Sequence, residues 1–94
     1  MNKIQITNLQ SLPKISGIYK VIDAEDNVIY IGQAKNIYQR WNQGHHKIGK
    51  ILKICGTDAY VSFVEVPEWL LNRAENAAIS FYQPALNLKN PPVV

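Results

Sequence analysis

Two short apolar segments separated by a polar turn constrain the fold of this chain more than any other feature. Residues 15–22 and 28–32 are rich in isoleucine, valine and tyrosine, and residues 23–27 between them are mostly short and polar. Apolar side chains at alternate positions are typical of a pleated strand. Short polar side chains satisfy backbone groups in turns. The pattern therefore predicts an antiparallel hairpin.

The alternation also predicts which side chains share a face of that hairpin. Isoleucines share one face of each strand: Ile18 and Ile22 in the first, Ile29 and Ile31 in the second. Because successive side chains of a strand point to opposite faces, a hairpin that buries these isoleucines places Tyr19 and Tyr30 together on its other face.

Helical periodicity and stop signals predict the remaining elements. Asn36 is a candidate helix cap and Gly44 a candidate stop. Helices are predicted over about residues 34–43, 46–54 and 67–82, and a third strand is predicted over 59–66. Both chain ends are predicted to be short tails, with Pro91–Val94 a frayed end.

Size and composition limit what else the chain can be. The 94 residues predict one domain, 1–94, and 47 % hydrophobic with 18 % charged residues is typical of a folded soluble protein. No apolar run reaches the roughly 18 residues that span a bilayer, and no signal-peptide pattern begins the chain, so we expect no membrane partner and a cytoplasmic location. The lone Cys55 excludes an internal disulfide.

One acid stands out on the last predicted helix. Glu75 shares a helix face with Leu71 and Ala78. A partly buried carboxylate requires a cation or hydrogen-bond donors around it. The alternatives are an exposed position or an ion pair with Arg73 or Lys89.

The order of several short motifs carries a family resemblance. Gly17-Ile18-Tyr19 is followed by Tyr30-Ile31-Gly32, then by Arg40 on a helix, by Glu75, and by an aromatic-x-Pro-x-x-Asn ending at residues 82–87. Over roughly residues 13–88 this set resembles the GIY-YIG nuclease family. The resemblance, together with the predicted elements, implies an α/β fold: a small sandwich with a three-stranded antiparallel sheet flanked by three or more helices.

The resemblance implies a metal-dependent endonuclease that hydrolyses DNA phosphodiester bonds. Glu75 is then the ligand of one Mg²⁺ or Mn²⁺ ion, because a single carboxylate suits a cation that keeps several waters. Arg40 stabilises charge on the phosphoryl oxygens. Tyr19 acts as base or water-orienting group, and Tyr30 orients the water or the phosphate. A free phenol, with pKa near 10, is a poor base at neutral pH and needs a nearby cation.

The sequence departs from the family pattern at two positions. Many relatives carry a histidine or tyrosine four residues after the arginine, where this chain has Gly44. We expect His45 to take that catalytic role, with His46 as the alternative. Repair-type relatives often have a lysine after the second motif, where this chain has Gln33. These departures motivate the alternative function, a non-catalytic nucleic-acid-binding module that keeps the nuclease fold.

Basic side chains supply the candidate DNA contacts, and the net charge of +3 permits a polyanionic partner. The candidates are Lys35, Lys47, Lys50 and Lys53. The alternative for the last three is the solvated face of an amphipathic helix. The implied partner is DNA, branched or damaged forms included, and the sequence does not determine the oligomeric state.

Three further residues are expected to shape the site without taking part in chemistry. Gly17 and Gly32 are predicted to allow close approach of the backbone. Asn87, which follows Pro84, is predicted to tie the end of the chain to backbone groups near the site.

Overall fold

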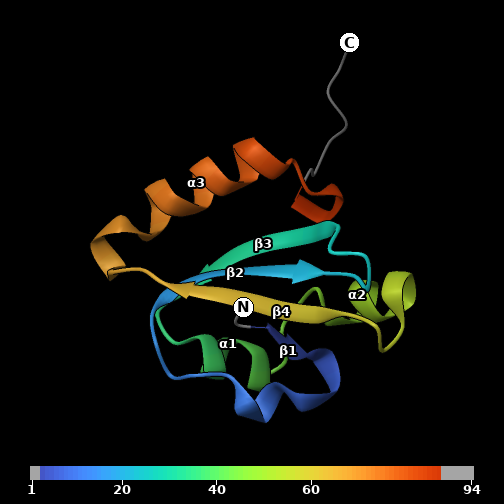
Figure 1. Ribbon diagram of the computed structural model, residues 1–94. Helices are drawn as coiled ribbons and strands as arrows, with labels where there is room; N and C mark the ends of the chain where they lie inside the picture. Colours follow the sequence, from blue (N-terminus) through green and yellow to red (C-terminus); the bar gives the residue numbers. More distant parts are fainter. Residues whose placement is uncertain (1–2, 88–94) are drawn as a thin grey trace.

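A four-stranded antiparallel sheet forms the centre of the computed structural model, which describes residues 3–87 (Figure 1). The strands lie in the order β1-β4-β2-β3. Their bounds are β1 Lys3–Gln5, β2 Gly17–Ile22, β3 Val28–Ala34 and β4 Tyr60–Glu65. The α/β sandwich is confirmed, with one strand more than the sequence predicted. The predicted end Pro91–Val94 lies outside the described residues.

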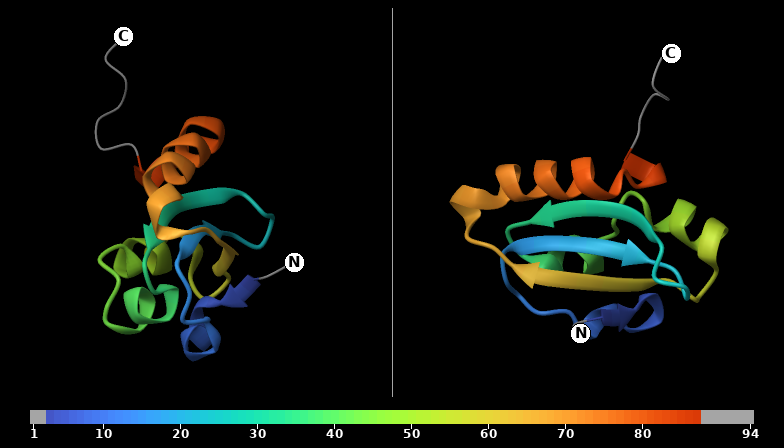
Figure 2. Two further views of the ribbon diagram at one scale, coloured as in Figure 1. Left: turned by 90° about the vertical axis from the view of Figure 1, so that its left-hand side faces the viewer. Right: turned by 45° about the horizontal axis from the view of Figure 1, so that its top comes forward.

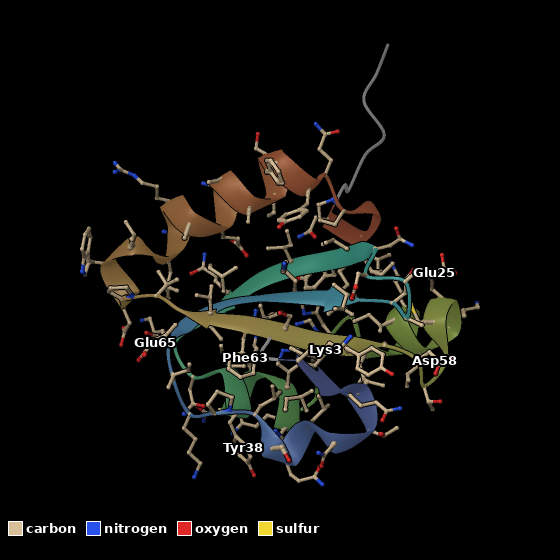
Figure 3. All side chains as sticks on the ribbon, in the orientation of Figure 1. Lys3, Glu25, Tyr38, Asp58, Phe63 and Glu65 are labelled. Atoms are coloured by element: carbon tan, nitrogen blue, oxygen red, sulfur yellow. The ribbon has the colours of Figure 1, made fainter. Side chains whose placement is uncertain are left out.

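The additional strand, β1, comes from the segment that we expected to be a tail. Its three residues pair with β4 in the register Lys3↔Ser62 to Gln5↔Tyr60. Lys3 lies against β4 (Figure 3), with its ammonium 4.8 Å from the centroid of the Tyr60 ring and 3.7 Å from the Asp26 carboxylate. Three residues are too few to show a strand period, so only the pairing with β4 defines this strand.

The helices fall close to their predicted positions. The α-helices are α1 Ile37–Asn42, α2 Ile48–Cys55 and α3 Leu71–Tyr82, and the 3₁₀ turns are η1 Ile6–Ser11, η2 Glu68–Leu70 and η3 Ala85–Asn87. Ala34, predicted to begin a helix, is instead the last residue of β3. The helix begins only after Asn36, whose side chain accepts a hydrogen bond from the Gln39 N–H at 2.9 Å.

The hairpin of β2 and β3 places the two tyrosines as their alternation predicted. Tyr19 pairs with Gly32 and Val21 pairs with Tyr30, so both tyrosines lie on one face of the sheet. Ile18 lies on the other face. The tyrosines are nevertheless buried, with 1 % of Tyr19 and 8 % of Tyr30 exposed, because helices cover both faces.

Two separate apolar clusters account for that burial. On the tyrosine face, α1 and α2 contribute Ile37, Trp41 and Ile51 to a core that also contains Tyr19 and Tyr30. On the opposite face, side chains of α3 pack against isoleucines of β2 and β3. Figure 2 shows α3 running along β3, with α1 and α2 behind the sheet. Within residues 3–87, no helix has both the length and the apolar character needed to span a membrane.

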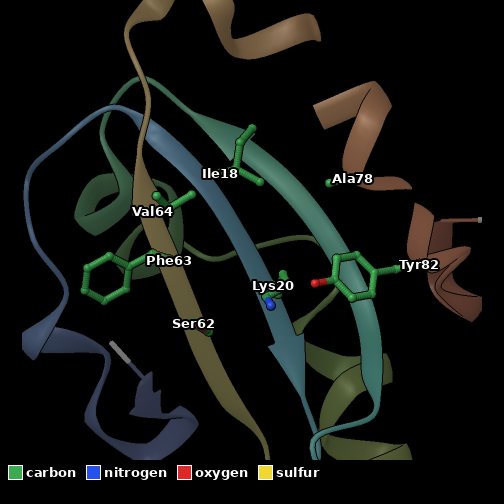
Figure 4. A pocket seen from close by; sticks show the side chains of 7 residues that line it. All are labelled: Ile18, Lys20, Ser62, Phe63, Val64, Ala78 and Tyr82. Carbon is green, nitrogen blue, oxygen red and sulfur yellow. The ribbon is translucent and has the colours of Figure 1, made fainter. Parts of the chain in front are cut away.

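The helix α3 leaves part of its face of the sheet open. A groove remains between α3 and β4, lined among others by Ile18, Val64 and Tyr82 (Figure 4). Val64 is 58 % exposed there, and the Lys20 ammonium lies 4.9 Å from the centroid of the Tyr82 ring. This groove lies on the face opposite Tyr19, so it is separate from the candidate site described below.

The outer edge of β3 is completed by a side chain. The Asn87 amide accepts a hydrogen bond from the Ile31 N–H and donates one to the Ile31 carbonyl, each at 2.7 Å. An edge strand otherwise presents unpaired backbone groups. Asn87 thus ties the end of the described chain to the strand that carries Tyr30.

We predict that Asn87→Ala lowers the free energy of unfolding by roughly 1–3 kcal/mol, because it removes two partners of partly buried backbone groups. Urea denaturation measures this change. Asn76→Ala, at an exposed position of α3, is the control and should change the free energy of unfolding by less than about 0.5 kcal/mol. Equal stability of the two variants would contradict the role given to Asn87.

Candidate active site

A cavity of about 470 Å³ opens at the β3 edge of the sheet. The tyrosines reach it from one face of the hairpin, Arg40 from α1, and Glu75 from α3, which lies over the other face. Its lining consists of Tyr19, Tyr30, Gly32, Gln33, Ala34, Lys35, Arg40, Asn72 and Glu75. The four residues most expected to act in chemistry, Tyr19, Tyr30, Arg40 and Glu75, are therefore brought together.

The two motif glycines make room for this arrangement. A Cβ atom at Gly32 would overlap the Tyr19 hydroxyl group. A Cβ atom at Gly17 would overlap the Val64 carbonyl oxygen of the neighbouring strand. Gly32 therefore lets the Tyr19 side chain come close to β3, and Gly17 lets the backbone of β4 come close to β2.

Tyr19 is held at the base of the cavity by aromatic neighbours and one hydrogen bond. Its hydroxyl lies 2.7 Å from Nε2 of His45, and its ring meets the edge of Trp41 at a centroid distance of 5.2 Å. Burial raises the pKa of Tyr19 well above its ordinary value, while interaction with the Arg40 guanidinium opposes that rise. Tyr19 is therefore a neutral phenol at pH 7.

His45 is buried beside Tyr19 with only 3 % of its surface exposed. Its ring stacks on Trp41 at a centroid distance of 4.1 Å. Burial lowers the pKa of His45 to about 4, so the imidazole is neutral at pH 7. The Lys47 N–H donates to Nδ1 at 3.1 Å, which leaves the single ring proton on Nε2. His45 thus donates its hydrogen bond to the Tyr19 oxygen.

Local backbone conformation decides which histidine enters the site. Gly44 follows α1 with a φ of +85°, a left-handed conformation that glycine adopts at low cost. The turn directs His45 inward beneath Trp41. His46 is exposed, stacks on His45 at 4.8 Å and meets the edge of Tyr30 at 6.3 Å.

Glu75 is half-buried and is positioned by an amide. Gln33 Nε2 donates to Glu75 Oε1 at 3.0 Å and to Asn72 Oδ1 at 2.7 Å. Within residues 3–87 the ion pairs are Lys3 with Asp26 and Lys35 with Glu68, so Glu75 does not pair with Arg73 there. Lys89 lies outside the described residues. Gln33, which departs from the family pattern, thus orients the acid.

Asn72 is the site residue that the sequence analysis missed. It lies three residues before Glu75 on α3. Residues three apart on a helix are neighbours on its surface, so this spacing from the acid is the signal that would have found it.

Burial affects the second tyrosine as well. Tyr30 contacts Tyr19 at a ring-centroid distance of 6.3 Å. Burial raises the pKa of Tyr30, and the nearby Glu75 carboxylate raises it further. Both phenols of the site therefore keep their protons at neutral pH.

The lysines are distributed unevenly around the site. Lys35 lines the cavity, and its ammonium lies 4.0 Å from the Glu68 carboxylate. Lys47 lines an adjoining cavity. Lys50 and Lys53 are exposed on α2 and line neither cavity.

The donor set limits what cation the cavity suits. Among the described residues, no group of three or more histidine, cysteine, aspartate or glutamate side chains gathers at one place. A cation here would therefore take one carboxylate, that of Glu75, and would complete its shell with water. Mg²⁺ binds in that manner, whereas a structural zinc site does not.

Comparison with known proteins agrees with this geometry. Residues 15–86 match the GIY-YIG catalytic domain family. The chain belongs to the GIY-YIG catalytic domain family. Because members of this family are nucleases, the chain is an enzyme domain of the nuclease class.

Curated relatives include several proteins named UvrABC system protein C. The one from Christiangramia forsetii is 34 % identical over 85 % of this chain and 14 % of its own length. The one from Salinibacter ruber is 31 % identical over 92 % of this chain and 14 % of its own length. This chain therefore spans about 14 % of the length of these relatives.

Solved structures of similar fold include the GIY-YIG N-terminal endonuclease domain of UvrC from Thermotoga maritima. Its magnesium-bound form is 25 % identical, with a TM-score of 0.71, covering 87 % of this chain and 93 % of that one. A point mutant bound to its catalytic divalent cation is 23 % identical, with a TM-score of 0.72, covering 88 % and 93 %.

The buried neutral His45 predicts a pH-dependent stability. Its pKa is about 4 in the folded chain against an ordinary value of 6.5, so the unfolded chain binds the proton first as the pH falls. The free energy of unfolding should therefore decrease between about pH 6.5 and pH 4, by up to roughly 3 kcal/mol. Urea denaturation in EDTA across this range measures the decrease.

His45→Gln is the control for this measurement, because an amide keeps hydrogen-bonding capacity but does not titrate. We expect a shallower loss of stability in this variant over the same pH range. Identical pH profiles for the two proteins would show that His45 is not the group responsible.

Proposed function

We propose that this chain is a metal-dependent endonuclease that hydrolyses DNA phosphodiester bonds with one divalent cation held by Glu75. The observation that carries the proposal is the convergence of Glu75, Arg40 and Tyr19 on one cavity, with His45 hydrogen-bonded to Tyr19 behind it. Phosphoryl transfer needs a positioned nucleophile and positive charge near the phosphoryl oxygens. These residues can supply both, with the help of a cation.

The residues fit a magnesium ion better than other cations. Glu75 presents a carboxylate oriented by Gln33, and the cavity leaves space for waters. The similar UvrC domain of Thermotoga maritima is described as bound to magnesium as its catalytic divalent cation. Mn²⁺, which shares the preference for oxygen ligands, is expected to substitute. When bound, the cation supplies Lewis-acid stabilisation of the phosphoryl charge.

Arg40 binds the phosphate that is cleaved. Its guanidinium is exposed at the cavity, where a phosphate can reach it. A guanidinium stays charged at all relevant pH values and binds phosphate oxygens through two parallel hydrogen bonds. Arg40 thus holds the phosphate against Tyr19 and Glu75.

Tyr19 orients the attacking water as a neutral phenol. Since its oxygen accepts the Nε2–H of His45, its own hydroxyl proton is free to point elsewhere, toward the cavity. The raised pKa makes a resting phenolate unfavourable. If Tyr19 acts as the base, its own proton first passes to solvent, and the resulting phenolate, stabilised by His45 and the Arg40 guanidinium, would then accept a proton from the attacking water. His45 therefore acts as a positioning residue, and Tyr30 helps to orient the water or the phosphate.

DNA reaches the cavity along basic side chains. Lys35 and Lys47 lie at opposite ends of the site, and Lys50 and Lys53 extend the positive charge along α2. Contacts of this kind are salt-dependent and do not depend on sequence. Branched or damaged DNA is included among the proposed substrates.

We predict that Glu75→Ala and Arg40→Ala each reduce Mg²⁺-dependent cleavage by at least about 100-fold, because each removes charge stabilisation in the transition state. A panel of duplex, flap, fork and four-way junction DNA, with Mg²⁺, Mn²⁺ or EDTA, measures it. Asn76→Ala should cleave as the unmodified chain does. DNA binding without cleavage of any substrate, unchanged by Glu75→Ala, would instead support a non-catalytic binding module.

We predict that Tyr19→Phe reduces kcat by roughly 100- to 10,000-fold and leaves KM within a few-fold, because only the hydroxyl contacts water. The phenyl ring keeps its contact with Trp41, but the buried Nε2–H of His45 loses its partner, so the melting temperature should fall by several degrees while the chain remains folded. Single-turnover cleavage and thermal melting measure the two effects. Normal kcat in this variant would exclude Tyr19 from the chemistry.

A further inference from the structure

A second cavity adjoins the proposed catalytic cavity, and the proposed chemistry does not use it. Its volume is about 490 Å³, which lies within the ~300–1,000 Å³ typical of small-molecule sites. Tyr30 and Glu75 line both cavities, so the two adjoin at the point where the cleaved phosphate is proposed to bind. The remaining lining residues are His46, Lys47, Ile79, Leu86 and Asn87.

The two cavities form one trough along β3. Lys35 and Asn72 lie in the first cavity only, whereas His46 and Lys47 lie in the second only. Tyr30 lies between these two groups. A nucleic-acid strand with its cleaved phosphate beside Glu75 would therefore place an adjacent nucleotide in the second cavity.

The lining of the second cavity combines apolar and aromatic surfaces. Ile79 of α3 and Leu86 of η3 supply apolar side chains that are half-buried in the protein. Tyr30 and His46 supply rings that meet edge to face, at a centroid distance of 6.3 Å. Such surfaces suit a flat, weakly polar ring.

The second cavity also has polar lining residues that suit a nucleotide. Asn87 is held rigid by its two hydrogen bonds to Ile31, so it forms a fixed wall. Lys47 provides a cation for a neighbouring phosphate. The described residues offer no group of three metal-binding side chains, so a second metal ion is the weaker explanation of this cavity.

We propose that this second cavity is a nucleobase subsite, which takes an unstacked base from the nucleotide next to the cleaved phosphate. The proposal rests on the proposed nuclease function and specifies its substrate class. A base must leave its pair and its stack to enter the cavity, and the energetic cost of doing so is least when the base is already unpaired. DNA with an unpaired nucleotide beside the cut is therefore preferred over a perfect duplex.

The test begins with mapping the cut site on end-labelled DNA and then changes the nucleotide on each side of it. At each position three substrates are compared: a paired base, an unpaired base, and an unpaired abasic residue. We expect the unpaired base on one side of the cut to give about 10-fold higher kcat/KM than the abasic residue, since contact of a base with aromatic side chains favours binding. We expect the paired base at that position to be cleaved more slowly than the unpaired one.

Two variants tie this preference to the cavity. His46→Ala and Leu86→Ala should each reduce the ratio of base to abasic cleavage toward one, while Asn76→Ala retains it. His46 is exposed, so its replacement tests the proposal even where Leu86→Ala lowers stability. Circular dichroism and thermal melting check the fold of each protein.

The outcomes separate the two proposals. Equal cleavage of base and abasic substrates on both sides of the cut would overturn the nucleobase subsite and leave the nuclease function standing. A preference that survives in both variants would also overturn the subsite, since another surface would then hold the base. Absence of metal-dependent cleavage for every substrate would overturn the nuclease function, and the subsite with it.

Discussion

The buried hydroxyl of Tyr19 is the constraint on which the arrangement of the site depends. A phenol oxygen enclosed by protein must be hydrogen-bonded, because leaving it without a partner costs about 1–3 kcal/mol. His45 meets that requirement at 2.7 Å, and Trp41 covers both rings. The glycine at position 32 leaves the space that the hydroxyl occupies. The hairpin, α1 and the turn after α1 therefore all contribute residues that pack around Tyr19.

The same bond explains how His45 comes to lie in the site although Gly44 has no side chain. A glycine there ends α1 early and cannot supply a side chain, but its left-handed backbone delivers the next residue to the site. His45 then arrives with its ring orientation fixed by the Lys47 N–H. The departure from the family pattern is thus a shift of one position along the chain.

The edge strand β3 carries a tyrosine of the site, and its outer edge borders the cavity. On one side of the sheet its tyrosine faces the cavity, and from the other side α3 reaches over the strand with Glu75. Asn87 pairs the outward backbone of Ile31, so this edge is occupied by a side chain rather than by a further strand. A fifth strand there would lie between the helix and the tyrosines. The side-chain pairing therefore keeps the trough open.

The order and spacing of its motifs determined much of this protein in advance. Alternation placed Tyr19 and Tyr30 on one face of a hairpin, and an acid on an apolar helix face marked Glu75, because both patterns are local and periodic. The short strand β1, the choice of His45 over His46, and the contact of Gln33 with Glu75 were decided only by tertiary structure. Each depends on groups far apart in the sequence or on one turn's backbone angle, which no local pattern records.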